Sequence, residues 1–261
     1  MRTLTFPVLS LGSVLPADTD SSALSTWILE RRGKETDLTT WNIEKTLTDL
    51  LEFVDYPAAG GEFYVDRILD ACGNVVDRNV SHEFDPDFGT ILADVSLVQS
   101  RRKNCWWSIP APSALDIGDA YFGDAEEFKT ALFETVSSLC RSMRDAGIPG
   151  HILTAEQPDE IELEYFTGKR YLWAVLDEYL PAILEIQKDI VITKEGVSLL
   201  PDLLDSFEIR NVYIRDADTA ALRSVLRHID PEYIRICGIG PEEGRPAYWR
   251  DLASVSVEST E

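Results

Sequence analysis

The chain has 261 residues, of which 46 are acidic and 24 are basic, so its formal net charge at pH 7 is −22. A field of this sign repels the phosphates of nucleic acids and the headgroups of anionic membranes, and we expect neither as a partner. The apolar fraction of 44% supports a sizeable core, and the length fits a single domain over residues 1–261, a common size for an α/β barrel.

The sequence carries no signal for secretion or for a membrane span. Its start, MRTLTFPVLSLGSVLP, lacks a basic region and a long apolar core, and no stretch of about 20 apolar residues occurs anywhere. We therefore expect a cytoplasmic protein. Only seven of the basic residues are lysine, and a lysine-poor acidic surface is what a salt-rich cytoplasm favours. The four cysteines are widely spaced, which predicts buried free thiols.

The first 60 residues predict a strand followed by two helices. Residues 4–11 are apolar enough for a first strand, and residues 21–31 have helical character. The segment TTWNIEKTLTDLLEFV places its apolar residues at three- and four-residue spacings, which predicts one apolar helix face. Pro57 and Gly60-Gly61 end this helix.

The next 50 residues predict strands. EFYVDRILDA and VVDRNVSHEF are joined across Cys72-Gly73-Asn74, which predicts a hairpin, although RILDA fits the start of a short helix equally well. TILADVSLV and NCWWSIPAP predict two further strands. Because adjacent strand residues face opposite ways, one of Trp106 and Trp107 points inward and the other toward the helices.

Strands and helices alternate in the second half of the chain. Asp124 followed by Glu127 resembles a capping box, and the helix that it starts ends at Gly147. The remaining predictions are strand HILTA, a long helix over 168–187 interrupted at Pro181, strand DIVIT, a short helix over 201–207, strand RNVYI, a helix over 219–228 and strand YIRICGI.

This alternation predicts a parallel sheet with its site at the carboxyl ends of the strands. The segment HILTAEQPDE is then of interest as part of a site, because its apolar strand is followed by Glu156, Gln157 and Asp159. We expect these side chains at the functional rim.

Three stretches of the sequence carry turn-forming and charged residues in a recognisable order. FPVLSLGSVLP ends a strand in a Gly-Ser turn and precedes the arginine-rich helix ILERRG, and AAGGEFYVDR sets a Gly-Glu pair before an arginine. Residues 107–158 contain SIPAPSAL, AYFGDAEEF, a helix closing in RDAGIPG, and ILTAEQP. Together they resemble the catalytic barrel of cobalamin-independent methionine synthase and the superfamily that it shares with uroporphyrinogen decarboxylase.

The resemblance implies a (β/α)8 TIM-type barrel over nearly the whole chain. The stretch after His228 is short for a complete barrel, so we expect abbreviated last units. The family holds the amino-acid portion of homocysteine at positions that correspond here to Leu11, Gly12, Ser13, Glu62 and Glu156. Glu156 stands where the family has aspartate, which keeps a carboxylate for a ligand ammonium.

The resemblance also implies zinc, which activates a thiol for methyl transfer from 5-methyltetrahydrofolate or a corrinoid. The family binds zinc through a His-x-Cys pair, a glutamate and a cysteine followed by glycine. DIVITKEG contains neither histidine nor cysteine; Cys237-Gly238 matches the last ligand, and Glu195 is a candidate acid. Two ligands do not complete a zinc site. A site from His151 and Cys105 on neighbouring strands is an alternative.

Three functions follow as hypotheses. The first is methyl transfer to a thiol such as homocysteine, which predicts bound zinc. The second is binding of a small amino acid or thiol without metal chemistry, either for regulation or for another reaction. The third is a scaffold whose acidic surface confers solubility, which predicts neither ligand nor metal.

Overall fold

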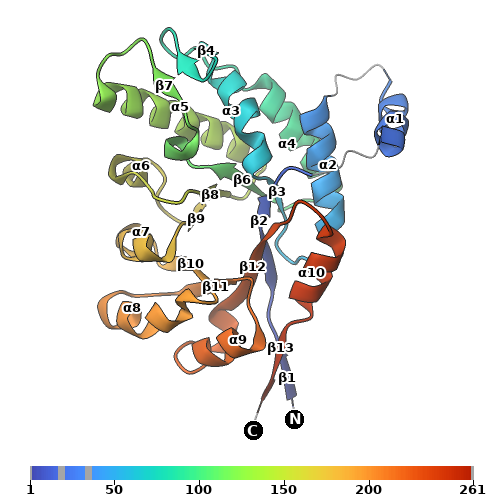
Figure 1. Ribbon diagram of the computed structural model, residues 1–261, viewed down its shortest axis with the longest axis vertical. Helices are drawn as coiled ribbons and strands as arrows, with labels where there is room; N and C mark the ends of the chain where they lie inside the picture. The colour runs from blue at the N-terminus through green and yellow to red at the C-terminus, as the bar shows by residue number, and fades with distance from the viewer. Residues whose placement is uncertain (1, 17–20, 33–36, 260–261) are drawn as a thin grey trace.

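The computed structural model describes residues 2–16, 21–32 and 37–259, so that Gly33 of ILERRG lies outside the described residues. In this part of the chain, eight parallel strands form the centre of the molecule (Figure 1). They are β2 (Val8–Ser13), β3 (Ala58–Gly60), β6 (Trp106–Pro110), β8 (His151–Thr154), β9 (Tyr171–Ala174), β10 (Asp189–Thr193), β11 (Asn211–Arg215) and β12 (Ile234–Gly240).

The strands pair in two four-stranded parallel sheets, in the orders β10-β11-β12-β2 and β3-β6-β8-β9. Two isolated parallel bridges, from Leu9 to Tyr56 and from Ser13 to Gly61, connect β2 with the β3 segment. Within the described residues, no ladder joins β9 to β10. The result is the α/β architecture with parallel strands that the sequence predicts, in the strand order of a (β/α)8 barrel.

Helices follow the strands and surround them (Figure 1). They are α1 (Ser21–Glu30), α2 (Leu38–Leu50), α3 (Val65–Cys72), α4 (Gly89–Arg101), α5 (Ala125–Asp145), α6 (Glu160–Tyr165), α7 (Leu180–Ile186), α8 (Leu200–Ser206), α9 (Thr219–Val225) and α10 (Arg245–Ala253). Short 3-10 turns are η1 (Glu62–Tyr64), η2 (Pro112–Ala114), η3 (Asp177–Tyr179), η4 (Gly196–Leu199) and η5 (Pro231–Tyr233).

Two small sheets lie outside the central strands. β1 (Arg2–Thr5) pairs antiparallel with β13 (Ser256–Ser259), which brings the two ends of the chain together at the bottom of Figure 1. The other small sheet consists of β4 (Val75–Val76), β5 (Asn79–Val80) and β7 (Gly118–Asp119). None of the described helices is both long and apolar enough to cross a membrane.

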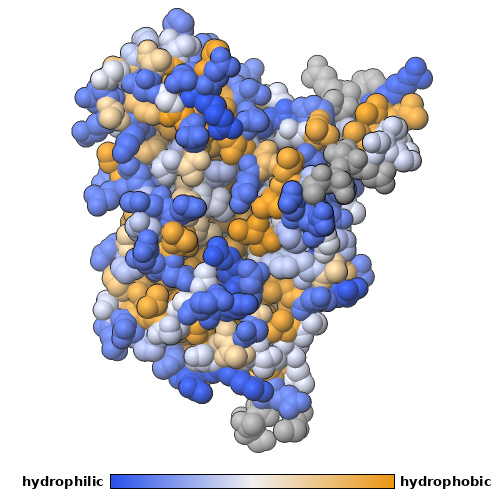
Figure 2. Space-filling view, in the orientation of Figure 1, coloured by the Kyte–Doolittle hydropathy of each residue, from blue (hydrophilic) through white to orange (hydrophobic). Residues whose placement is uncertain are grey.

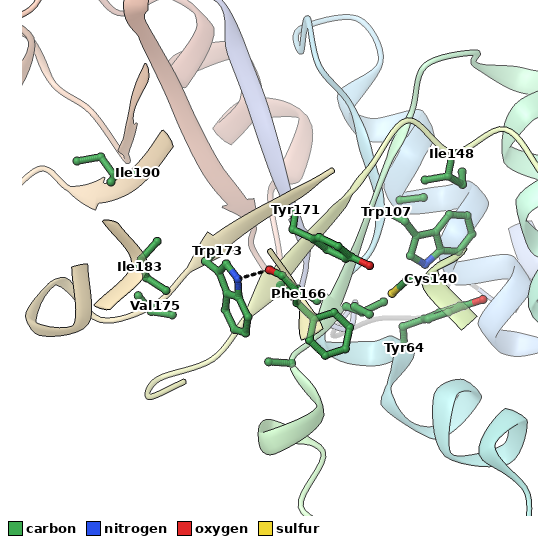
Figure 3. Packing of buried hydrophobic residues seen from close by; sticks show 14 of the residues in the cluster. Tyr64, Trp107, Cys140, Ile148, Phe166, Tyr171, Trp173, Val175, Ile183 and Ile190 are labelled. Atoms are coloured by element: carbon green, nitrogen blue, oxygen red, sulfur yellow. Dashed lines mark hydrogen bonds between the residues drawn. The ribbon is translucent and has the colours of Figure 1, made fainter. Parts of the chain in front are cut away.

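The central strands are buried on both faces, which explains their continuous apolar sequences. One face contributes to an inner cluster, made of Leu9, Leu11, Ala58, Ile152, Leu172, Ala174, Val191 and Cys237. The other face packs against the helices in the layer that Figure 3 shows, where the Trp173 indole N–H donates to the carbonyl of Phe166 at 3.0 Å. As predicted, the adjacent tryptophans separate, because Trp106 contacts the inner cluster and Trp107 the outer layer.

Three predicted elements are wrong. Residues 62–72 form η1 and α3 instead of a hairpin strand, so the short-helix alternative is correct. TILADVSLV belongs to α4, in which Ile91, Val95 and Val98 are buried on one face. The predicted helix over 168–187 contains strand β9 before η3 and α7, and its Pro181 lies in the first turn of α7, where its missing N–H leaves no helical hydrogen bond unmade.

Two further differences concern the first and the last of the parallel strands. The predicted first strand is interrupted at Phe6-Pro7 and divides into β1 and β2. The expected abbreviation of the last units holds for helices α7, α8 and α9, which have seven residues each, but not for the last strand, because β12 is seven residues long and α10 follows it. Residues 171–174, which were predicted as part of a helix, form the central strand β9.

The capping prediction for α5 is confirmed in part. The Asp124 carboxylate accepts the backbone N–H groups of Glu126 and Glu127 at 3.0 and 2.9 Å, which fixes the start of the helix. On the face shown in Figure 2, hydrophilic and apolar residues are interspersed. The apolar residues Ile28 and Leu29 of α1 are exposed.

Candidate functional site

A cavity of about 400 Å³ opens at the carboxyl ends of the parallel strands. Its volume falls within the range of small-molecule sites, and most of its wall is apolar. The lining residues are Glu62, Val65, Pro110, Ala114, Thr154, Ala155, Glu156, Ala174, Val175, Leu176, Arg215 and Ile239. Three of these side chains are ionisable: Glu62 and Glu156 come from the connections after β3 and β8, and Arg215 from the end of β11.

Glu62 follows β3 through a sharply bent Gly60-Gly61 pair. Gly61 has a φ of 130°, and its N–H donates to the carbonyl of Ser108 at 2.9 Å. A β-carbon on Gly61 would lie 2.1 Å from the carbonyl oxygen of Ser13. Glycine is therefore needed for β2 and β3 to approach this closely, and the approach directs Glu62 to the cavity.

Glu156 follows β8 in a connection that hydrogen bonds fix at its start and at its end, where α6 begins. Its carbonyl accepts the N–H of Leu176 at 3.1 Å, which ties it to the end of β9. Asp159 then caps α6, and the buried Glu162 carboxylate accepts the N–H and the hydroxyl of Ser113 at 2.9 and 2.7 Å. The connections after β6 and β8 are thus joined beside the cavity.

Arg215 is the cationic residue of the cavity, and it was not predicted from the sequence. It ends β11, and Tyr213, two residues earlier on the same strand face, packs against the inner cluster. The alternation in RNVYIR was the available signal, because it places residues 213 and 215 on one face. Within the described residues, the Arg215 guanidinium forms no hydrogen bond or ion pair.

The carboxylates of Glu62 and Glu156 are similarly without an ion pair or a side-chain hydrogen bond in the part of the chain that the structure describes. Both side chains are exposed to solvent. Two acceptor-only groups and one donor-only guanidinium therefore line one cavity without neutralising each other. Such a cavity can bind a small ligand that carries both a cationic and an anionic group.

Leu11, Gly12 and Ser13 do not line the cavity. Leu11 belongs to the inner cluster, and its carbonyl accepts the Ser108 hydroxyl at 2.6 Å. Gly12 has a φ of 105° and lies against the Ser108 side chain. Ser13 is buried, its hydroxyl lacks a hydrogen-bond partner, and it is bridged to Gly61. These residues support the Gly61-Glu62 turn, and their predicted contact with a ligand stays a prediction.

Cys237 lies in the inner cluster and does not line the cavity. Burial, followed by the nearby Asp216 carboxylate, raises the pKa of its thiol well above the ordinary value. Among the residues with described positions, no group of three or more histidine, cysteine, aspartate or glutamate side chains is arranged to hold a metal ion. This donor set does not fit a zinc site, and Cys237 as a zinc ligand stays a prediction.

His151 lies on the outer face of β8, away from the cavity. It is fully buried and packs on Tyr171, with 5.9 Å between the ring centroids. Neither ring nitrogen has a hydrogen-bond partner. Burial raises the pKa of the Cys105 thiol to about 12, which keeps it protonated at neutral pH. Nothing in this geometry supports the alternative site from His151 and Cys105.

A larger hollow, of about 740 Å³, lies outside the strands among α2, α3 and α4. Three of its charged groups are paired with one another, since Arg67 contacts Asp37 at 2.7 Å and Asp94 at 3.1 Å. The Tyr64 hydroxyl also donates to Asp94 at 2.9 Å. This pairing is typical of a structural network, so the smaller cavity is the better candidate site.

The comparisons with known proteins support the fold. The structure is similar to that of a B12-independent methionine synthase from Shewanella sp. W3-18-1, solved in complex with selenomethionine, with a TM-score of 0.65 and 12% sequence identity over 95% of each chain. At this identity the likeness concerns the fold alone. No family model and no curated protein match the sequence.

Replacing Gly61 by alanine is expected to destabilise the protein by about 3 kcal/mol or more, because both the φ and the contact with Ser13 oppose a β-carbon. Urea unfolding measures the loss. Gly123→Ala is the matched control: Gly123 has a φ of 72°, but no atom lies within 4 Å of the place that a β-carbon would take, so only strain of about 1 kcal/mol applies. Equal losses in the two variants would contradict the close approach of β2 and β3.

Proposed function

We propose that this methionine-synthase-like protein binds a small amino acid or thiol in the cavity at the carboxyl ends of its strands. The observation that carries the proposal is the presence of Glu62 and Glu156, both without ion-pair partners among the described residues, in the wall of one cavity. Two carboxylates from separate strands offer charge-assisted hydrogen bonds to a ligand ammonium group. The acidic net charge of the whole chain also favours the approach of a cationic group.

The location of the cavity supports the proposal independently of its residues. In parallel α/β folds, ligands bind at the carboxyl ends of the strands, where the connections are free to vary. The similar Shewanella enzyme was solved with selenomethionine, which is an amino acid, and this agrees with a ligand of that class here.

Methyl transfer to a thiol such as homocysteine is a second proposal, favoured by the likeness of the fold to a methionine synthase. The reaction needs the thiol as a thiolate. The donor set around Cys237 does not fit the zinc that would supply this activation, so we derive no catalytic step. Binding without methyl transfer, or a scaffold role, is the alternative.

Replacing Glu62 or Glu156 by glutamine should weaken binding of methionine or homocysteine at least about tenfold in each variant, because each substitution removes a charged acceptor without removing volume. Isothermal titration calorimetry of the purified protein measures this effect. Glu185→Gln is the control, because Glu185 is exposed on α7, away from the cavity, and changes the net charge equally. Unchanged affinity in both cavity variants would show that the site is elsewhere.

Metal analysis of the same preparation separates the two proposals. Stoichiometric zinc together with homocysteine binding would support methyl transfer and would require ligands that the present arrangement does not bring together. Amino-acid binding without zinc would support the binding function. The scaffold alternative would be supported if wild-type protein contained no zinc and bound neither homocysteine nor methionine.

A further inference from the structure

We propose that Arg215 binds the carboxylate of the ligand and thereby makes the cavity selective for α-amino acids over amines and thiols that lack a carboxylate. The inference rests on the proposed function, because it concerns the same cavity. It adds the residue that distinguishes one class of ligand from another.

The first support is the unpaired state of Arg215. Other arginines are paired with carboxylates. Arg210, for example, donates two hydrogen bonds to Asp189, at 3.0 and 2.7 Å. Arg215, in contrast, has no hydrogen-bond or ion-pair partner for its guanidinium among the described residues, although it is only partly exposed. A guanidinium has five donors and no acceptor, so these donors are available to an anionic group of a ligand.

The second support is the position of Arg215 in the cavity. It approaches from β11, whereas Glu62 and Glu156 come from the connections after β3 and β8. A planar guanidinium matches a carboxylate through two parallel hydrogen bonds, and lysine does not provide this geometry. An α-amino acid carries its ammonium and its carboxylate on the same carbon, so it can interact with groups of both signs in one cavity.

The third support is the apolar part of the wall. Beyond the charged groups, the cavity is lined by Val65, Pro110, Val175, Leu176 and Ile239. Burial of apolar ligand surface against these residues favours binding. The chemistry therefore points to an α-amino acid with an apolar or thioether side chain.

Three related ligands test the inference by calorimetry: L-methionine, 3-(methylthio)propylamine, which lacks the carboxylate, and 4-(methylthio)butanoate, which lacks the ammonium. We expect methionine to bind at least about tenfold more tightly than the amine. Arg215→Gln should reduce methionine affinity by about the same factor and should not weaken binding of the amine, which has no carboxylate for the guanidinium. Arg215→Lys should restore only part of the loss, because the charge returns without the paired hydrogen bonds.

Arg250→Gln is the control for the change in net charge. Arg250 is exposed on α10, and its ion pair is with the adjacent Asp251 at 3.5 Å. Retained binding of the amine to Arg215→Gln shows that the variant is folded and that the rest of the site is intact.

The outcomes distinguish this inference from the proposed function. If the wild-type protein binds the amine as tightly as methionine, or if Arg215→Gln binds methionine normally, the assignment of Arg215 is overturned while the ligand site stands. If methionine binds and the Glu62 and Glu156 variants retain affinity whereas Arg215→Gln loses it, the assignment of the carboxylates is overturned instead. If the wild-type protein binds none of the three ligands, both proposals are overturned.

Discussion

Replacing His151 by leucine is expected to make the protein markedly more resistant to unfolding in acid. His151 is completely buried between β8 and the outer helices, and neither ring nitrogen has a hydrogen-bond partner. Burial, and secondarily the positive charge of Arg144, lowers the pKa of this imidazole to about 3 from an ordinary value near 6.5. The folded protein therefore accommodates the neutral ring and opposes its protonation.

The direction of the pH dependence follows from the lowered pKa. Above about pH 6.5 the ring is neutral in both the folded and the unfolded chain, so its contribution to stability is fully present. Between about pH 6.5 and 3 only the unfolded chain binds the proton, and stability falls as the pH falls, by about 1.4 kcal/mol per pH unit. At pH 4 the histidine then lowers stability by about 3 kcal/mol.

Urea unfolding of the wild-type and His151→Leu proteins between pH 7.5 and 4 measures this contribution. Leucine should at least preserve stability at pH 7.5, because it removes two buried polar atoms without partners. The two curves should separate progressively below pH 6.5. His228→Gln, at an exposed position, should follow the wild type. Parallel curves for wild type and His151→Leu would mean that His151 is protonated at little cost in the folded protein.

The sequence was sufficient where an element has one polar and one apolar face. Helices α2 and α5 were predicted from the spacing of their apolar residues, and the carboxylate of Asp124 marks the first turn of α5 as expected. The strands β8, β10, β11 and β12 were also predicted, since each is a short apolar run bounded by polar residues or turn residues.

The failures have separate physical origins. YLWA is buried on both faces of β9, so it shows no alternation and fits a helix equally well. TILADVSLV is rich in β-branched residues, yet it lies in α4, because tertiary packing of Ile91, Val95 and Val98 outweighs their strand propensity. The three residues of β3 were too few to predict a strand.

The residues of the candidate site were predicted only in part. Glu62 and Glu156 were identified by their resemblance to family positions, and both line the cavity. Arg215 was missed, because its role depends on which face of β11 turns inward and on the lack of a carboxylate partner among the described residues, and neither property is local in sequence. Ser13 was placed at the right strand end, but its side chain is buried beside Gly240.

Replacing Glu162 by alanine is expected to destabilise the protein by about 3 kcal/mol and to weaken ligand binding. The Glu162 side chain is completely buried, and its carboxylate accepts the N–H and the hydroxyl of Ser113 and the N–H of Asp159. Burial raises the pKa of this carboxyl, and the three donors oppose the rise. Alanine removes three hydrogen bonds to a charged acceptor, each of which contributes about 1–3 kcal/mol.

The effect on binding follows from the position of this carboxylate between two connections of the cavity. Ala114 in η2 and Glu156 before α6 both line the cavity, and the bonds from Ser113 to Glu162 hold η2 and α6 together. Urea unfolding and methionine calorimetry measure the two effects. Glu160→Ala is the matched control, because Glu160 is exposed in the first turn of the same helix. If both alanine variants lost the same stability, helix propensity would explain the loss, and the buried carboxylate would have no special role in holding Glu156 at the cavity.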